Sequence, residues 1–421
     1  MEKQSESRRS FLKASAATLA ASASVLGAND RVQMAVIGTG TRGTQVHGAF
    51  LKHKDAAFTA ACDVARDRLD QFLKVNPDEK MDAYGDYRRV LERKDIDAVL
   101  ITTPDHWHSP IMVAAVEAGK DVYVEKPVSN TIAAALKMVE AARTHKQVVQ
   151  VGLQQRSWDH FQECAKIIQD GYIGKVTHCV MNFASSYTRA PEQPEDPPST
   201  LDWEMFEGPA PRRPYTPGRQ RGWRGYYDYG GGIVTDWGVH LWDVAHWFMN
   251  ADAKTPLLAS AVAQYVRFDV PSKDQVPDAV IVSAQYDNFV ASFTNQAMPN
   301  PEFEFWGNYF FGDRGTMLVN RLGYMVRPNP VRRRPGGPEP PPPIENKFFK
   351  NPAGMSENSS ATLPSATMNH ARNFLDCVKS RKQTVCPMEV GFNSSLPCLL
   401  GVVATQQGRS VGWDRRTAQV V

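Results

Sequence analysis

The chain has 421 residues, too many for one small hydrophobic core, so its length indicates two domains with additional segments. Hydrophobic residues make up 42% and charged residues 22%, which is typical of soluble globular proteins and excludes a disordered or membrane-embedded chain. The 48 Lys and Arg against 45 Asp and Glu give a formal net charge of +3, so neither a nucleic acid nor an anionic membrane is expected as a partner.

The first 28 residues differ in composition from the rest of the chain. They open with Ser7-Arg8-Arg9-Ser10-Phe11-Leu12-Lys13 and continue as a mildly apolar stretch rich in alanine and serine. A transmembrane anchor needs about 20 strongly apolar residues, so stable membrane insertion is not expected. The segment resembles a twin-arginine export signal, and a disordered basic tail is the alternative. We therefore expect residues 1–28 to direct export by that route, to the periplasm or another extracytoplasmic site.

A glycine-rich turn follows the first strand-like run. Residues 32–37 are apolar and rich in β-branched side chains, which is typical of a buried parallel strand. Gly38, Gly40 and Gly43 then fit G-x-G-x-x-G at the start of a predicted helix. In a dinucleotide-binding turn the first glycine permits the tight turn and the second lets the backbone approach a pyrophosphate. The third allows the helix to pack closely on the strand.

An acidic residue stands where a dinucleotide-binding unit requires one. A second strand-like run, 57–62, ends at Asp63, which is 20 residues after Gly43. A carboxylate there accepts hydrogen bonds from the adenosine ribose hydroxyls and repels a 2′-phosphate. The motif therefore predicts NAD and makes NADP less favoured, although Arg42 and Arg66 are close enough in sequence to offset the carboxylate. An unliganded α/β turn with a surface aspartate is the structural alternative.

Strands and helices continue to alternate after Asp63. The predicted elements are strand 97–101, helix 109–119, strand 121–124, helix 131–146 and strand 147–152. This alternation predicts a doubly wound parallel sheet, in which ligands bind outside the carboxyl ends of the strands. We assign residues 29–152 to a Rossmann dinucleotide-binding domain. The loop 102–108 and the turn Glu125-Lys126-Pro127 fall at its ligand-binding edge.

The pattern changes after residue 152. A predicted helix at 161–170 is followed by runs rich in β-branched and aromatic residues at 175–183, 257–268, 279–293 and 303–310. Strands without intervening helices favour a mostly antiparallel sheet, so we assign residues 153–421 to a second, α+β domain. Two proline-dense segments, 190–217 and 327–344, are expected to form loops, and a last helix is expected at 369–380.

A second informative stretch follows three consecutive glycines at 230–232. On a helix, Asp236, His240 and Asp243 stand at i, i+4 and i+7, so all three lie within about 60° of one another. A histidine between two carboxylates binds a proton more tightly, which suits a general base near neutral pH. A metal site and a purely structural helix are the competing interpretations, and no metal is predicted because a third ligand at the expected spacing is missing.

Lys126 makes the general-base interpretation the favoured one. An ammonium group at the carboxyl edge of the sheet, beside the cofactor, can hydrogen-bond the hydroxyl to be oxidised and stabilise the developing alkoxide. His240 can then remove the hydroxyl proton as hydride leaves for the nicotinamide. The predicted cofactor contacts are Gly38, Gly40, Thr41, Arg42, Gly43, Asp63, Thr103, Pro104, His106, His108, Glu125 and Lys126.

Aromatic and arginine residues are frequent around this stretch. Tryptophan faces stack on sugar rings, while arginine, aspartate and histidine bind hydroxyls, so a small carbohydrate or polyol ligand is expected. Ordinary core packing is an equal alternative for each aromatic residue taken alone. The predicted substrate contacts are Arg156, Trp158, Trp223, Arg224, Asp236, Trp237 and His240.

These motifs together resemble one enzyme family, the Gfo/Idh/MocA oxidoreductases, from about residue 31 to the C-terminus. The features that carry the resemblance are the glycine turn, Asp63, the loop 104–108, Glu125-Lys126-Pro127, and Asp236 with His240 after a glycine run. The resemblance implies a Rossmann domain, a nicotinamide cofactor, and a second domain whose open, mostly antiparallel sheet often forms contacts between subunits. It also implies a homo-oligomer, a dimer or tetramer, with Lys126, Asp236 and His240 as the catalytic set.

We therefore expect an exported, NAD-dependent oxidoreductase acting on a secondary hydroxyl of a sugar, glycoside or polyol. One alternative is a glycosidase or lyase that oxidises its substrate transiently, and product analysis separates the two because only net oxidation consumes an acceptor. The other is a nucleotide-bound carbohydrate sensor, which would bind sugar without reducing the cofactor. The residues do not indicate which sugar or which carbon reacts.

Overall fold

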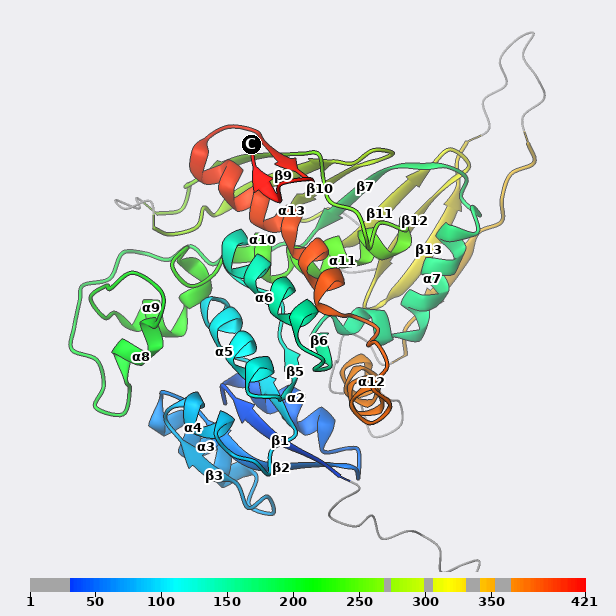
Figure 1. Cartoon of the computed structure of the whole chain (residues 1–421). Coiled ribbons are helices and arrows are strands. Elements are labelled where there is room, and N and C mark those ends of the chain that lie inside the picture. Colours follow the sequence, from blue (N-terminus) through cyan, green and yellow to red (C-terminus); the bar gives the residue numbers. More distant parts are fainter. Residues whose placement is uncertain (1–30, 269–273, 299–305, 331–340, 353–364) are drawn as a thin grey trace, which may run out of the picture.

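The computed structural model describes residues 31–268, 274–298, 306–330, 341–352 and 365–421, and the predicted export segment 1–28 lies outside these ranges. Two sheets, each with its own helices, lie one above the other in Figure 1, with helices between them. Within the described ranges, every helix is too short or too polar to span a membrane.

The N-terminal sheet has six parallel strands in the order β3-β2-β1-β4-β5-β6, which confirms the predicted Rossmann domain. Its strands are β1 (Val32–Ile37), β2 (Ala56–Cys62), β3 (Asp82–Tyr84), β4 (Ala98–Ile101), β5 (Asp121–Val124) and β6 (Val149–Val151). Its helices are α2 (Thr41–Phe50), α3 (Arg66–Val75), α4 (Tyr87–Leu91), α5 (Asp105–Glu117) and α6 (Ile132–Thr144). Strands β4 and β5 are buried along their whole length, as expected for central strands covered on both faces.

Helix α5 begins four residues earlier than predicted. Ser109-Pro110 suggested a cap and a first-turn proline, but the helix starts at Asp105 after an extended Pro104, and Pro110 lies inside it. The predicted loop 102–108 is therefore wrong in its second half, because an acidic residue in the first turn provides the start signal instead. As a result His106 and His108 are held on a helix.

In the part of the chain that the structure describes, the second sheet has ten strands in the order β14-β13-β12-β11-β7-β10-β9-β8-β15-β16. Of the pairings described, only β7 with β10 is parallel, so the predicted mostly antiparallel sheet is confirmed. The strands are β7 (Val176–Asn182), β8 (Leu258–Gln264), β9 (Ala279–Gln285), β10 (Val290–Thr294), β11 (Gly307–Gly312), β12 (Gly315–Asn320), β13 (Gly323–Pro328), β14 (Lys347–Lys350), β15 (Val411–Asp414) and β16 (Gln419–Val420). The predicted run 279–293 is thus a hairpin of two strands, and residues 303–305 of the last predicted run lie outside the described ranges.

Among the described residues, the helices α7 (Asp159–Gln169), α11 (Gly238–Phe248) and α13 (Met388–Gln407) contact this sheet, and α13 also connects it to the Rossmann domain. The sequence interpretation missed α13, which contacts both α6 and strand β8. Glycines let it approach both domains closely, because a Cβ at Gly391 would lie 2.5 Å from Val151 and one at Gly401 would lie 2.6 Å from Val282. Because α13 is apolar on all sides, it lacks the alternation of polar and apolar residues that identifies an amphipathic helix in a sequence.

The C-terminal half of the chain also contributes to the Rossmann core. Helix α12 (Ala366–Ser380) packs on α2, and its Phe374 and Leu375 join a buried cluster with Phe50 and Tyr123. The last predicted helix is therefore present, three residues longer at its start. The assigned second domain, 153–421, thus includes one helix that covers the first.

A long segment between β7 and α10 (Gly232–Asp236) extends from the second domain onto the Rossmann domain. We call residues 184–230 the covering segment, which contains α8 (Trp203–Glu207), α9 (Pro217–Arg221) and the 3-10 turn η3 (Trp223–Gly225). Its residue 201 forms an antiparallel bridge with Ala65, and the amide of Arg66 donates to the carbonyl of Thr200 at 2.7 Å. The covering segment therefore lies over the end of β2, where the dinucleotide motif predicts the adenosine ribose.

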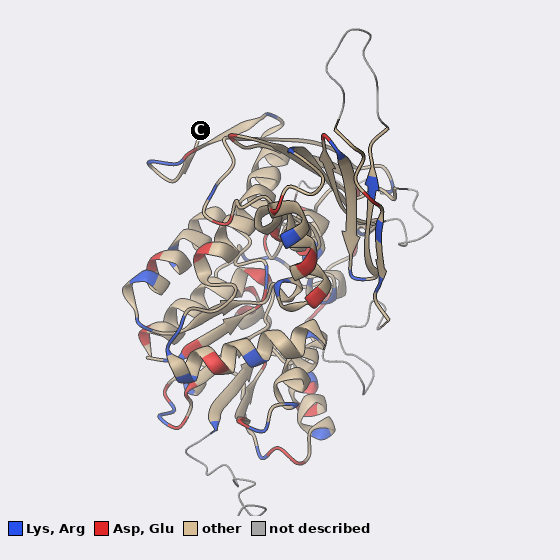
Figure 2. Ribbon diagram, turned by 90° about the vertical axis from the view of Figure 1, so that its right-hand side faces the viewer, with Lys and Arg blue, Asp and Glu red and all other residues tan. Residues whose placement is uncertain are grey.

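Charged residues of both signs are interspersed over the helices and loops seen in Figure 2. This view agrees with the near balance of basic and acidic side chains in the sequence. Among the described residues in this view, neither sign of charge dominates an extended region.

The packing of α2 predicts different effects for two of its glycines. A Cβ added at Gly43 would lie 2.1 Å from the carbonyl oxygen of Gly38, whereas one at Gly48 would have no neighbour within 4 Å. Gly43→Ala should lower the free energy of unfolding by about 1–3 kcal/mol or more through overpacking. Gly48→Ala, the matched control, should be neutral or stabilising by up to about 1 kcal/mol. Urea unfolding curves measure both, and equal stability of the two variants would contradict the packing.

Candidate active site

The glycine turn has the geometry of a dinucleotide-binding turn. Gly38 has φ of +95°, and a Cβ there would lie 2.7 Å from the backbone of Thr102 and Thr103. Only glycine fits a position that is both left-handed and this crowded. At Gly40, by contrast, a Cβ would meet only the Arg68 guanidinium, at 3.8 Å, so the missing side chain leaves room for a ligand.

The N-terminus of α2 faces the same space. Gly40 occupies its N-cap position and supplies no side-chain cap, and Thr41 and Arg42 line the cavity beside it. The first backbone N–H groups of a helix have no partner within the helix and attract anions, helped by the helix dipole. This end of α2 therefore fits the pyrophosphate of a dinucleotide.

Asp63 is fixed at the end of β2. Its Oδ2 accepts from the amide and hydroxyl of Thr39 at 2.8 and 3.0 Å, and its Oδ1 accepts from the amide of Ala65 at 2.9 Å. The carboxylate lines the cavity, where its remaining lone pairs fit ribose hydroxyls. Arg42 and Arg66, which the sequence suggested could offset this charge, pair with Glu125 and Asp70 instead.

A cavity of about 840 Å³ continues from this turn into the space between the two domains. The Rossmann domain, α10, α11, the covering segment and the β12–β13 turn all contribute to its walls. Its lining includes most of the predicted site: Gly38, Gly40, Thr41, Arg42, Asp63, Thr103, Pro104, His108, Glu125, Lys126, Trp223, Arg224, Asp236, Trp237 and His240.

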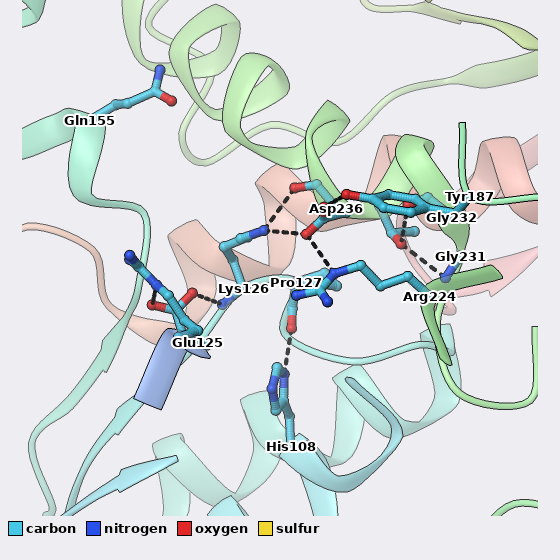
Figure 3. A network of polar contacts seen from close by, with 12 residues as sticks. His108, Glu125, Lys126, Pro127, Gln155, Tyr187, Arg224, Gly231, Gly232 and Asp236 are labelled. Atoms are coloured by element: carbon cyan, nitrogen blue, oxygen red, sulfur yellow. Dashed lines mark hydrogen bonds and ion pairs between the residues drawn. The ribbon is translucent and has the colours of Figure 1, made fainter. Parts of the chain in front are cut away.

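Lys126 and Asp236 form a buried ion pair across the two domains (Figure 3). The Lys126 Nζ lies 2.7 Å from Asp236 Oδ1 and donates to the Asp236 carbonyl at 2.9 Å. Arg224 lies 3.2 Å from the same Oδ1, and the Tyr187 hydroxyl donates to Oδ2 at 2.5 Å. Burial alone would raise the pKa of Asp236, but Lys126 and Arg224 hold that pKa below its usual range. The carboxylate therefore stays charged and holds the ammonium in place.

Glu125 and His108 support Lys126 from the Rossmann side. Glu125 accepts from Arg42 Nε at 2.8 Å and from the amide of Lys126 at 3.3 Å. His108 contacts the Pro127 carbonyl at 2.7 Å and the Thr103 carbonyl at 3.0 Å through its two ring nitrogens. These contacts fix the backbone on both sides of Lys126, so its side chain enters the cavity from a rigid turn.

His240 lines the cavity beside this network and is 4% exposed. Burial lowers its pKa well below the usual value, and the charges of Lys126 and Arg321 lower that pKa further. The sequence had instead predicted that two neighbouring carboxylates, Asp236 and Asp243, would raise the pKa of His240. That prediction is wrong for Asp243, which is buried outside the cavity lining.

Asp243 binds Arg156 instead. Arg156 Nε donates to both Asp243 oxygens at 2.9 and 3.0 Å, and its other nitrogens donate to Asp252 at 2.9 and 2.7 Å. Ser394 of α13 donates to Asp243 at 2.8 Å. The predicted single helix is interrupted at Trp237, because Asp236 ends α10 while His240 and Asp243 lie on α11. The partner of Asp243 comes from the 3-10 turn η2 (Gln154–Ser157), which helical spacing could not identify.

Four of the predicted ligand contacts do not line the cavity. Arg156 is occupied by its two carboxylates, and Trp158 packs in the core against His160 and Phe161. His106 is buried with Nε2 2.9 Å from the Phe206 carbonyl, so it anchors the covering segment. Gly43 serves the packing of α2, as the third glycine of the motif should.

The cavity also contains residues that the sequence interpretation did not select. They are Arg68 beside Gly40, Gln154 from η2, and Arg321 from the second sheet. Tyr187, which is bonded to Asp236 behind this lining, was also not selected. Gln154 Oε1, Thr103 Oγ1 and His240 Nδ1 are buried without a hydrogen-bond partner in the described structure. Unsatisfied buried polar atoms lining a cavity indicate a polar ligand.

A metal ion fits this site poorly. Within the described ranges, no three His, Cys, Asp or Glu side chains cluster so as to hold one. Asp236, the cavity-lining carboxylate nearest to His240 in sequence, is bound by an ammonium, a guanidinium and a phenol. The donor set therefore favours the organic cofactor that the glycine turn accommodates.

Comparison with known proteins agrees with this architecture. Residues 32–153 match the family model described as "Oxidoreductase family, NAD-binding Rossmann fold". Residues 161–287 match "Oxidoreductase family, C-terminal alpha/beta domain", so the two matches cover more than half of the chain. The fold and site define an NAD-binding two-domain oxidoreductase. The chain belongs to the Gfo/Idh/MocA family.

Several inositol dehydrogenases are similar over part of their length. Myo-inositol 2-dehydrogenase of Thermotoga maritima is 28% identical over 252 residues, which is 60% of this chain and 64% of that protein. Inositol 2-dehydrogenase of Salmonella typhimurium is 33% identical over 238 residues, 54% of this chain and 60% of that protein. The matches thus span less than two thirds of each relative.

Solved structures share the whole fold at low identity. Levoglucosan dehydrogenase, in complex with NADH and levoglucosan, superposes with a TM-score of 0.66 at 17% identity. The superposition covers 91% of this chain and 99% of that one. At this identity the likeness concerns the arrangement of the two domains.

The contacts of Asp243 predict a structural role for it. Asp243→Ala should lower the free energy of unfolding by about 3 kcal/mol or more, because it leaves the buried Arg156 guanidinium with one carboxylate fewer. Glu389→Ala removes an exposed partner of Arg143 and should cost at most about 1 kcal/mol. Urea midpoints compare the two variants. An Asp243→Ala protein as stable as the control would return Asp243 to the candidates for a catalytic role.

Proposed function

We propose that the protein is an NAD-dependent oxidoreductase that removes hydride from a secondary hydroxyl of a sugar, glycoside or polyol. One observation carries the proposal: the dinucleotide-binding turn and the trio Lys126, Asp236 and His240 line a single cavity. The partial match to inositol dehydrogenases supports this substrate class. Bound NAD supplies the hydride acceptor.

Lys126 binds and polarises the substrate hydroxyl in this proposal. Its ammonium group has three donors, of which two are directed at Asp236. The remaining N–H can bind a substrate oxygen and stabilise the negative charge that grows on it. Asp236, Arg224 and Tyr187 supply a rigid support, so little reorganisation is needed during the reaction.

His240 removes the hydroxyl proton. A general base must be deprotonated before the reaction, and the lowered pKa keeps the imidazole neutral throughout the neutral range. The positive charge of Lys126 lowers the basicity of His240, but it also favours the alkoxide that forms when the proton leaves. His240 therefore accepts the proton while Lys126 stabilises the alkoxide that remains, so each domain contributes one side chain to this step.

Asp63 selects NAD over NADP in this proposal. A 2′-phosphate would meet a carboxylate that already accepts three hydrogen bonds, and Arg42 and Arg66 are paired elsewhere. Arg68 lines the same end of the cavity, so its positive charge is the one best placed to weaken the preference for NAD over NADP. NAD and NADP titrations of the same preparation test the preference.

The outer face of the second sheet suggests a homo-oligomer. Val262, Ile281, Val290 and Phe311 lie on β8, β9, β10 and β11 and are 75%, 50%, 42% and 40% exposed. Val262 and Ile281 are direct neighbours across β8 and β9. Exposed apolar side chains at several places on an open sheet favour association of two copies. Sedimentation velocity tests this, and a monomer at micromolar concentration would exclude it.

We also propose export by the twin-arginine route. The motif at residues 7–13 supports it, and that route carries folded proteins, so the nucleotide can be bound before export. Cell fractionation with Arg8 and Arg9 both replaced by Lys tests the proposal. Unchanged distribution of the protein would contradict it.

The roles of Lys126 and His240 predict a large loss of chemistry with binding preserved. Lys126→Met should reduce hydride transfer about 10²–10³-fold, and His240→Gln about 10²–10⁴-fold. NADH formation with a sugar and polyol panel measures the rate, and fluorescence titration with NADH confirms that each variant still binds cofactor. Near-normal turnover in both variants would remove the two residues from the mechanism. Aglycone release without an added acceptor would instead identify the bond-cleaving alternative.

The lowered pKa of His240 predicts the pH dependence. Because the folded protein holds the imidazole neutral, kcat/KM should stay level from alkaline pH down through 6.5, the usual histidine value. It should fall only at lower pH, as the base becomes protonated. Arg321→Gln removes a charge that lowers this pKa, so its acidic limb should move to higher pH. A wild-type acidic limb above pH 7 would contradict the environment of His240.

A further inference from the structure

Asp105 places a buried carboxyl group in the wall of the cavity. It is the first residue of α5, directly after the extended Pro104, and it is only 4% exposed. It lines the cavity together with Lys126 and Asp236. Among the described residues, its side chain has neither a hydrogen-bond partner nor an ion-pair partner. A buried polar group that faces a cavity without a partner of its own indicates a polar ligand.

The covering segment holds Asp105 in this position. The amide of His106 donates to the Tyr229 carbonyl at 3.3 Å, and His106 Nε2 lies 2.9 Å from the Phe206 carbonyl. A Cβ at Gly230 would lie 3.3 Å from Asp105 Oδ2, which is tighter than most van der Waals contacts. The glycine therefore leaves the space that the carboxyl group occupies, and α5 and the covering segment together fix that group at the cavity wall.

Two positively charged side chains act on Asp105, but both are bound to another carboxylate. Lys126 and Arg224 lie 2.7 and 3.2 Å from Asp236 Oδ1 (Figure 3). Burial raises the pKa of Asp105 well above its usual value, and Asp236 adds to this effect while Arg224 opposes it. The carboxyl group therefore holds a proton more readily than an ordinary aspartate, and when protonated it has one O–H donor and a carbonyl acceptor. A sugar hydroxyl likewise donates one hydrogen bond and accepts another, so the two groups are complementary.

An aromatic ring borders the same part of the cavity. Trp223 lines the cavity and is half-buried. A Cβ at Gly230 would lie 3.1 Å from Trp223 Cζ3, so the indole and the Asp105 carboxyl group meet at one glycine. The Arg224 Cζ lies 4.3 Å from the centre of the indole ring. An aromatic ring beside polar side chains suits a ligand that has both apolar faces and hydroxyl groups, as a sugar ring does.

We propose that Asp105 is a specificity residue, which binds a second hydroxyl of the substrate while Lys126 binds the hydroxyl to be oxidised. This inference rests on the proposed oxidoreductase function and narrows its substrate class to molecules that carry a hydroxyl at the position of Asp105. A substrate that lacks this hydroxyl leaves the buried carboxyl group without a partner, and a site of this kind discriminates strongly against such an analogue.

A cycle of protein variants and ligand analogues tests the inference. The probes are glucose, galactose, glucitol and myo-inositol, each with its analogues that lack one hydroxyl. Isothermal titration calorimetry on the NADH-loaded protein gives the dissociation constants, and kcat/KM is recorded where NAD is reduced. For the probe that binds most tightly, wild-type protein should bind one deoxy analogue 10–100-fold more weakly than the parent. Asp105→Ala should bind the parent and that analogue equally, within about threefold.

Two further variants define the contact. Asp105→Asn keeps a donor and an acceptor at nearly the same place, so it should retain at least part of the preference for the parent ligand. Glu117→Gln, the matched control, alters an exposed carboxyl group at the other end of α5 and should keep the whole preference. Fluorescence titration should give an NADH affinity within about threefold of wild type for all three variants.

Each outcome supports or overturns the inference. If wild-type protein binds every deoxy analogue as tightly as the parent, the inference is overturned, and this result needs no variant. If Asp105→Ala weakens the parent and all analogues by one factor, or loses NADH affinity by that factor, Asp105 acts on the fold or the cofactor and the inference is also overturned. If wild-type protein binds no cofactor, or none of the probes, the proposed function fails first and the inference falls with it.

Discussion

The buried ion pair between Lys126 and Asp236 is the contact on which the arrangement of the site depends. It joins the carboxyl end of the Rossmann sheet to the last residue of α10 in the second domain, 110 residues later in the chain. Each side chain is only 11% exposed, so neither charge is well hydrated and each depends on the other. Removing one partner would leave a charge in a cavity wall, which explains why Arg224 and Tyr187 also converge on Asp236.

This pair has consequences on both sides of the cavity. On the cofactor side, Glu125 and His108 hold the turn that carries Lys126. On the substrate side, the charge of Lys126 acts with burial to keep His240 neutral. The two candidate catalytic groups thus influence one another electrostatically. The covering segment completes the enclosure, and its anchors on Ala65 and His106 lie beside the cofactor half.

The Rossmann half was predictable because its signals are local. The apolar run 32–37, the glycine spacing and Asp63 each report on a few neighbouring residues, and the structure places all of them as the motif requires. The mostly antiparallel second sheet was predictable for a similar reason. Helix α13 was not, because it is buried between two domains and its glycines and Pro397 interrupt any helical pattern.

The three central residues of the candidate site could be predicted from the sequence, whereas most of the residues that contact them could not. Lys126, Asp236 and His240 were predicted from the motif at the strand end and from helical spacing, and they line one cavity, whereas Asp243, selected by the same spacing, binds Arg156 instead. Periodicity reports which face a residue lies on, and only the tertiary fold determines its partner. Tyr187 and Arg321 come from a loop and a strand turn with no local signature.

The central claim is that Lys126 and His240 meet across a bound nicotinamide ring. A crystal structure of the protein with NAD tests it most directly. The account predicts the pyrophosphate at the N-terminus of α2, the adenosine ribose on Asp63, and the nicotinamide between Lys126 and His240. A nucleotide bound elsewhere, or a nicotinamide ring directed away from these two side chains, would contradict it.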